Sequence, residues 1–345
     1  MGIIGRHSFE LCSRPRIISS ASYVGDKEGK GPLREFFDKI CRDDTLGLDS
    51  WEQAESRMFE SAVRVALAKI KRQSDDLSCL LGGDLLNQII SSGFAAREIR
   101  APFIGLYGAC STISEGLMLG GMLVDGGFAE LAACAASSHF SAAERQFRYP
   151  LEMGVQAVPS SQRTVTGAGS IIIQAAGEFR PGAGNVFEHV ALTGGTIGSV
   201  EDFGITDANN MGAAMAPAAF KTIKTHLSDY SRRVEDYDRI ITGDLGIFGS
   251  DMLYELLRGE GIEIADRHED CGKLMFSPEQ NVNCGASGCG CAATVMSSWF
   301  LPKIESGEIR RVLFLATGAL MSPVSSLQGE SIPSIAHAVV IEHID

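Results

Sequence analysis

The sequence predicts a mixed α/β fold made of two similar halves. Short apolar segments that end in glycine-rich turns alternate with longer segments whose apolar residues recur at helical spacing. In residues 75–85, acidic residues precede an apolar run that ends in Gly-Asp-Leu, and residues 237–245 repeat this arrangement. A glycine-rich turn that leads into an apolar helix also occurs twice, at 108–110 and at 288–291. The repeated order of elements indicates an internal duplication.

The first half begins with a predicted helix over residues 50–71, in which Ala54, Met58 and Ala62 fall on one face. The apolar run before Gly83-Asp84 suits a buried strand that is closed by a tight turn. Further along the chain we expect a strand over 103–106, a helix from residue 113 and a strand over 131–135.

The second half repeats these elements, with helices predicted over 215–227 and 251–257 and a strand over 312–316. The interval from Cys110 to Gly126 is 16 residues, and the interval from Cys291 to Gly307 is also 16. This equality pairs Cys110 with Cys291. The Gly- and Pro-rich segment 177–185 is the predicted boundary, which divides the chain into residues 1–178, with Cys110, and residues 179–345.

Composition excludes several classes of protein. The chain has 345 residues, 45% of them apolar, and a formal net charge of −13, which argues against binding to nucleic acid. Nine cysteines form no even framework of disulfides, so we infer a reducing compartment. The first 20 residues lack the apolar core of a signal peptide, and the low-charge stretch 103–123 is interrupted by Glu115. Any membrane role is therefore expected to come through a partner.

Cys110 is the residue with the clearest chemical signal. It lies between a predicted strand and the first turn of a helix, where the helix N-terminus is expected to lower the pKa of the thiol and where backbone N–H groups can meet an anion. The alternative is that this cysteine packs as a small hydrophobic residue among Gly and Ala.

The chain resembles the thiolase-like superfamily, which includes thiolases and ketoacyl synthases. The resemblance rests on residues 107–112 around Cys110, on residues 135–139 and on the Gly-Ala-Gly segment within 164–172. It implies a five-layer αβαβα fold with a pseudo-twofold axis, a homodimer, and Cys110 at the base of a pocket.

Acyl transfer in that superfamily needs a His or Asn pair that activates the thiol and stabilises the oxyanion. In this chain the turn 242–249 contains no imidazole, and the motif 282–288 offers only Asn283. We therefore predict a degenerate site with no catalytic residue. A thiolase- or ketoacyl-synthase-like acyltransferase that uses Cys110 and recruits Asn283 or His139 is the alternative.

Two arginines and two aromatic residues lie close together in segment 143–150, shortly after Ser138 and His139. Guanidinium groups clamp carboxylates and aromatic faces stack on rings, so Arg145 and Arg148 suit a planar dianionic acid. A subunit interface is the alternative for this segment.

His139 follows a strand, and a single histidine in such a position is more often a structural group than a catalytic base. Three cysteines in segment 284–291 are interpreted as small-residue packing, and we expect no metal and no cofactor.

A narrower resemblance comes from the runs 193–198, 202–212 and 214–219, together with the segments around Cys110 and Arg145. These are similar to the stage V sporulation protein AD family. That resemblance implies non-catalytic binding of dipicolinic acid (pyridine-2,6-dicarboxylate), free or as its calcium chelate, in the machinery for its uptake into spores and its release at germination. It also implies a peripheral position at the spore inner membrane, beside membrane-spanning subunits.

The predicted ligand-binding residues are the following: Cys110, Ser138, His139, Arg145, Arg148 and Asn283. Besides the acyltransferase, a purely architectural subunit with a filled pocket stays open as an alternative.

Overall fold

The computed structural model describes residues 2–146 and 158–345. Within this part of the chain, the main sheet has 13 strands, and its central path follows the order β12-β11-β14-β15-β10-β3-β9-β7-β5-β6. The path consists of two groups of five strands, which meet where β10 contacts β3.

The two groups contain the same elements in the same order. The first half consists of β3 (Arg16–Val24), α1 (Trp51–Lys69), β5 (Cys79–Gly83), α2 (Ile90–Ile99), β6 (Phe103–Gly105), α3 (Thr112–Asp125), β7 (Leu131–Ser138) and β9 (Gly167–Gln174). The second half consists of β10 (Val190–Thr196), α5 (Met211–Asp229), β11 (Arg239–Thr242), α6 (Gly246–Arg258), β12 (His268–Asp270), α8 (Cys289–Val295), β14 (Arg311–Ala319) and β15 (Ser334–His343).

Strand pairing confirms the duplication. In the first half β5 runs parallel to β6 and β7, while β9 runs antiparallel to β7 and β3. In the second half β11 runs parallel to β12 and β14, while β15 runs antiparallel to β14 and β10. The predicted boundary between residues 178 and 179 falls in the connection from β9 to β10. The division into two domains at that point stays a prediction.

Smaller elements complete the chain. The remaining strands are β1 (Gly2–Ile4), β2 (Ser8–Glu10), β4 (Lys39–Ile40), β8 (Arg163–Thr164) and β13 (Ala286–Ser287). The remaining α-helices are α4 (Phe140–Glu144), α7 (Cys271–Met275), α9 (Leu301–Glu305) and α10 (Pro323–Leu327). Short 3-10 helices lie at Glu28–Lys30, Arg34–Phe36, Ser74–Asp76, Asn87–Ile89, Val234–Asp236 and Pro278–Gln280, and Met296–Phe300 forms one π-helical turn.

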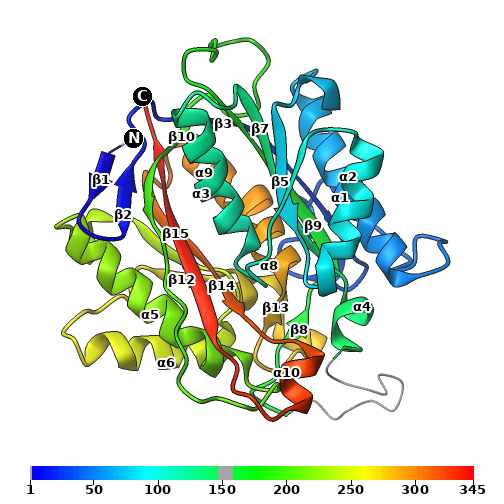
Figure 1. Ribbon diagram of the computed structural model, residues 1–345, viewed down its shortest axis with the longest axis vertical. Coiled ribbons are helices and arrows are strands. Elements are labelled where there is room, and N and C mark those ends of the chain that lie inside the picture. Colours follow the sequence, from blue (N-terminus) through cyan, green and yellow to red (C-terminus); the bar gives the residue numbers. More distant parts are fainter. Residues whose placement is uncertain (1, 147–157) are drawn as a thin grey trace.

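The elements stack in layers (Figure 1). Helices α1 and α2 pack on the outer side of the first half, and α5 and α6 pack on the outer side of the second. Helix α3 lies between the halves, because it contacts both β7 and β15, and α8 packs beside it against β7 and β9. This arrangement gives the five layers that the resemblance implied.

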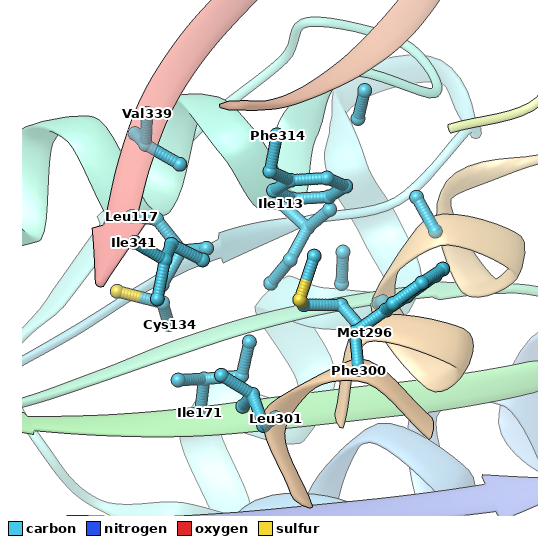
Figure 2. Packing of buried hydrophobic residues seen from close by; sticks show 14 of the residues in the cluster. Ile113, Leu117, Cys134, Ile171, Met296, Phe300, Leu301, Phe314, Val339 and Ile341 are labelled. Carbon is cyan, nitrogen blue, oxygen red and sulfur yellow. The ribbon is translucent and has the colours of Figure 1, made fainter. Parts of the chain in front are cut away.

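The core between the halves explains why the two central helices are apolar on several faces (Figure 2). Ile113 and Leu117 of α3 lie near Phe314 of β14 and Ile341 of β15, and all four side chains are buried. A helix enclosed on several sides buries side chains all round its surface, whereas α1 buries one stripe that includes Ala54, Met58 and Ala62.

Local signals set the ends of the outer helices. Ser50 precedes α1 and its side chain accepts a hydrogen bond from the backbone N–H of Gln53, which satisfies one of the donors that a helix N-terminus leaves open. Asn210 does the same for α5 through the N–H of Ala213.

The expected pairing of Cys110 with Cys291 is wrong. Helix α3 begins two residues after Cys110, whereas α8 begins at Cys289, two residues after Ser287. Ser287 is therefore the counterpart of Cys110. The equal intervals arose because the second central helix is longer, with the π-helical turn and α9 between α8 and Gly307.

In the described ranges, no helix has both the length and the hydropathy that a membrane crossing requires.

We predict that Gly169→Ala lowers the free energy of unfolding by about 1–3 kcal/mol, as measured by urea denaturation. A Cβ atom at Gly169 on β9 would lie 2.3 Å from the carbonyl oxygen of Ala293 on α8, so the central helix would have to shift. Gly177→Ala is the control, because a Cβ atom there meets nothing within 4 Å. Equal stability of the two variants would show that α8 does not pack this closely on β9.

Candidate functional site

Cys110 is positioned by the loop between β6 and α3. The side chain is 7% exposed, and the preceding residue, Ala109, has a φ of 48°, in the left-handed region that residues other than glycine rarely adopt. The second half supports this strained loop, because Gly318 of β14 packs directly against it. A Cβ atom at position 318 would lie 2.1 Å from the carbonyl oxygen of Gly108. The two halves therefore meet at the cysteine.

The second half places a hydroxyl and a carboxylate beside the thiol. Oγ of Ser287 lies 3.8 Å from Sγ of Cys110 and donates a hydrogen bond of 2.8 Å to Oδ2 of Asp244. Asp244 also accepts hydrogen bonds from the N–H of Gly288 (3.0 Å) and from Oγ1 of Thr317 (2.8 Å). Gly288 has a φ of 103°, which directs its N–H toward the carboxylate and favours glycine.

Burial and charge determine the protonation of this group of residues. Burial raises the pKa of the Cys110 thiol well above its usual range, and the nearby Asp244 carboxylate raises it further. The pKa of Asp244 is also raised by burial, although its hydrogen bonds to Gly288 and Ser287 oppose that shift. The expected lowering of the thiol pKa by the helix N-terminus is therefore wrong, because desolvation and a like charge outweigh it. Cys110 is a neutral thiol at neutral pH.

A cavity of about 60 Å³ opens above Cys110. Its described lining is mainly apolar and consists of Leu85, Tyr107, Ala109, Cys110, Ala143, Glu144, Gln146, Gln162, Thr164, Met211, Met215, Ser287, Ala319, Met321, Ser322 and Pro323. Both halves contribute to it. No Lys, Arg or His is present among these described lining residues.

Gln162 supplies the cavity wall with a fixed amide. Its Nε2 donates to the carbonyl oxygens of Asp244 (2.5 Å) and Ala286 (2.9 Å), and the side chain is buried. Within the described part of the chain, Oε1 of Gln162 has no hydrogen-bond partner. A buried acceptor without a partner is costly, so a ligand that donates a hydrogen bond or carries a cation would be favoured here.

Two of the predicted ligand residues have structural roles beside the cavity. Oγ of Ser138 donates to the carbonyl oxygen of Val165 (2.6 Å) and accepts from the N–H of Gly290 (3.0 Å), which ties β7 to α8. His139 caps α4 through Nδ1, and its Nε2 lies 2.9 Å from the carbonyl oxygen of Asp44. Burial lowers the pKa of His139, so the imidazole is neutral. Neither residue lines the cavity.

The other predicted residues also lie away from the thiol. Arg145 forms an ion pair with Glu52 and lies over the ring of Trp51, although its neighbours Glu144 and Gln146 line the cavity. Nδ2 of Asn283 donates to the carbonyl oxygen of Val158 (2.9 Å), and Asn283 is exposed. Arg148 lies outside the described residues. The structure therefore brings Cys110 alone of the predicted set into the described cavity wall, and the ligand roles of the others stay predictions.

The remaining buried histidines belong to hydrogen-bond networks elsewhere. His226 bonds to Thr196 and Tyr237, and His268 bonds to Thr242 and Tyr254. Burial lowers the pKa of each of these two imidazoles to about 3 and that of His337 to about 4. All three imidazoles are therefore neutral structural groups at neutral pH.

The cysteines that follow Asn283 pack against the backbone. Sγ of Cys289 donates to the carbonyl oxygen of Ala109, and Sγ of Cys284 accepts from the N–H of Phe248. Across residues 2–146 and 158–345, no group of three His, Cys, Asp or Glu side chains is arranged to hold a metal ion.

Sequence reasoning missed Asp244, Ser287 and Gln162. The Asp244 signal was visible, since its Gly-Asp-Leu turn is one of the repeated motifs, but an acid in a turn is ordinarily a capping residue. Ser287 and Gln162 carry no signal until the fold places them next to Cys110.

Sequence comparison determines the family. The sequence model of the stage V sporulation protein AD family matches residues 5–342. The chain belongs to this family. It is 43% identical, over 343 residues, to stage V sporulation protein AD of Bacillus subtilis strain 168, which covers 99% of this chain and 98% of the relative.

Solved structures confirm the thiolase-like fold of this family member. The 3-oxoacyl-[acyl-carrier-protein] synthase III of Aquifex aeolicus matches with a TM-score of 0.57 at 10% identity, covering 95% of this chain and all of the other. Cerulenin-bound OleA of Xanthomonas campestris matches with a TM-score of 0.57 at 14% identity, covering 98% of each chain. At these identities the likeness shows the fold alone.

We predict that iodoacetamide modifies Cys110 slowly at pH 7–8 and that Asp244→Asn makes the reaction several-fold faster, because the substitution removes a negative charge that disfavours the thiolate. Mass spectrometry of the Cys110 peptide measures the rate. Cys12, which is exposed, serves as the internal control for reagent activity. Fast alkylation of Cys110 in the unmodified chain would contradict the neutral thiol.

Proposed function

We propose that this chain binds dipicolinic acid in the cavity above Cys110 and does not catalyse acyl transfer. The observation that carries the proposal is a buried, neutral thiol in the wall of a mainly apolar cavity, with a buried carboxylate near the thiol, in a member of the stage V sporulation protein AD family.

The non-catalytic part of the proposal follows from the groups around the thiol. A thiol nucleophile needs a base that removes its proton and a donor that stabilises the oxyanion. Ser287 and Asp244 occupy the place nearest to Cys110, and a carboxylate there makes loss of the thiol proton harder. In this proposal Cys110 forms part of the cavity wall and has no catalytic role.

The apolar part of the lining suits the flat pyridine ring, and the cavity of about 60 Å³ has to widen to admit the whole acid. Met211, Met215 and Met321 contribute polarizable thioethers, which pack well against aromatic faces. Nε2 of Gln162 and the hydroxyls of Thr164 and Ser287 would each have to exchange their present acceptor for a carboxylate oxygen of the ligand. Oε1 of Gln162 is an acceptor, so it suits the calcium of the chelate.

The two negative charges of dipicolinate need a positive charge near them. Glu144 lines the cavity, and Arg145 is engaged with Glu52, so two sources of compensation are proposed. One is the pair Arg145 and Arg148, after Arg145 exchanges Glu52 for the ligand. The other is calcium carried within the chelate, which offsets both carboxylates before the ligand enters the cavity.

The proposed role follows from the family. The chain would act as a subunit of the machinery that takes up dipicolinate during sporulation and releases it during germination. We place it on the cytoplasmic side or surface of the spore inner membrane, as a homodimer beside membrane-spanning subunits.

Calorimetric titration with dipicolinic acid tests the site. Two charge-assisted contacts, partly cancelled by desolvation, suggest roughly micromolar affinity. Ala319→Phe puts a ring into the cavity and is expected to raise the Kd about tenfold or more. A tenfold change corresponds to about 1.4 kcal/mol of binding free energy. Ala101→Phe, at a similarly half-buried alanine outside the cavity lining, should leave the affinity unchanged. Equal affinities for both variants would place the ligand elsewhere.

A second titration identifies the compensating charge. Replacing Arg145 and Arg148 together with Ala is expected to weaken binding of free dipicolinate, and more strongly at low salt, where charge is less screened. The pair Arg97 and Arg258, both exposed, provides the matched control. If the double variant keeps its affinity and added calcium raises it, calcium supplies the charge. If neither change matters, the proposed charge compensation is wrong.

The acyltransferase alternative has a direct test. Incubation with short acyl-coenzyme A substrates is expected to leave the mass of the Cys110 peptide unchanged. An acyl adduct on Cys110, together with steady turnover, would establish the alternative.

A further inference from the structure

Two segments that the cavity does not use form a continuous exposed surface. Residues 197–209, between β10 and α5, run alongside the segment 328–334 that leads into β15 (Figure 1). Glu201 and Ser334 exchange two backbone hydrogen bonds of 2.9 and 2.7 Å, and the N–H of Ile332 donates to the carbonyl oxygen of Ile205 at 2.7 Å. We call this the acidic–apolar surface. Its exposed side chains are Ile197, Val200, Asp202, Phe203, Asp207 and Glu330, and Glu201 is half-buried among them.

Apolar side chains are concentrated on this surface. Ile197 is 46% exposed, and Val200 and Phe203 are each 56% exposed. Single exposed apolar residues are common on proteins, but three of them within seven residues, on a segment without helical or strand structure, indicate a contact surface.

Charge on this surface has one sign. Neither segment contains Lys or Arg, and the sequence has none between Arg180 and Lys221 or after Arg311. Glu201, Asp202, Asp207 and Glu330 are all acidic. Among the ion pairs that the structure describes, none includes any of these four carboxylates.

The surface is held in one conformation by its own hydrogen bonds. Oδ1 of Asp202 accepts from the N–H of Gly204 (2.8 Å), and Oδ2 accepts from Oγ of Ser331 (2.5 Å). These bonds lower the pKa of Asp202, which therefore stays ionised. A surface that is already ordered loses little conformational entropy on binding.

We propose that the acidic–apolar surface binds a protein partner whose contacting segment interleaves Lys or Arg with apolar side chains. The exposed apolar residues supply burial, and the four carboxylates select the sign of the partner's charge. Nucleic acid and an anionic lipid surface share the charge of this surface and are repelled. A second copy that met it through a twofold axis would bring carboxylates onto carboxylates.

The surface is connected to the cavity through the chain. Residues 197–209 lead directly to Met211, and the segment before residue 328 contains Met321, Ser322 and Pro323, all of which line the cavity. A partner on this surface would therefore contact the segments that form one side of the cavity wall. The proposal stands on this surface alone and does not depend on the identity of the ligand.

A peptide titration on the purified full chain tests the proposal. The probe is a short peptide of alternating leucine and lysine with a photoreactive terminal group, and its counterpart replaces each lysine with glutamate. At physiological salt, we expect the lysine peptide to bind and the glutamate peptide not to bind. After illumination, the cross-links should map to residues 197–209 and 328–334.

Matched variants separate this surface from the general negative charge of the chain. The double variant Val200→Ser, Phe203→Ser should lower the affinity for the lysine peptide about tenfold. Phe128→Ser, at a site that is 81% exposed, should leave that affinity unchanged. Glu201→Gln with Glu330→Gln should weaken it more than Glu178→Gln with Glu235→Gln, which removes the same charge elsewhere.

The opposite results overturn the proposal. Absence of binding, equal binding of both peptides, equal effects of test and control variants, or cross-links that fall outside the two segments would each show that the surface does not select a basic, apolar partner.

Discussion

The buried carboxylate of Asp244 is the interaction on which the geometry of the site depends. It lies in the turn after β11 and bonds to the N-terminal end of α8 through Ser287 and Gly288, and to β14 through Thr317. A buried carboxylate is costly unless several donors surround it, so these elements are held in one arrangement. Cys110, from the other half of the chain, packs against that arrangement. Burial raises the pKa of the thiol, and the same carboxylate that organises the site raises it further.

This constraint explains how the thiolase-like fold of this chain can hold a buried cysteine in its neutral form. The helix N-terminus that follows Cys110 favours an anion there, but desolvation and Asp244 oppose it. A helix N-terminus stabilises a nearby anion by up to about 2 kcal/mol. Burying a charged group without a partner costs more than this, so the thiol form is favoured over the thiolate. The cavity wall then contains a neutral thiol, an amide from Gln162 and thioethers, and the proposed binding of dipicolinate rests on this set of groups.

Much of the fold could be predicted from sequence, because periodicity reports directly on burial. The stripe of Ala54, Met58 and Ala62 predicted α1, and the Gly-Asp turns at residues 84 and 244 marked equivalent strands in the two halves. The register between the central helices could not be predicted, since the π-helical turn at 296–300 lengthens one helix without changing its composition. The site was harder to predict from the sequence, because Asp244, Ser287 and Gln162 come together only in the folded chain. Arg145 looked like a ligand clamp in sequence, yet the fold places Glu52 within its reach.

The central claim is that the cavity above Cys110 holds dipicolinate as a bound ligand. A crystal structure of the full chain grown with dipicolinic acid and calcium tests it most directly. The account predicts density for a planar ring among Met211, Met215 and Met321, with no covalent bond to Sγ of Cys110. Density for the acid at another site with an empty cavity, or an acyl group attached to Cys110, would contradict it.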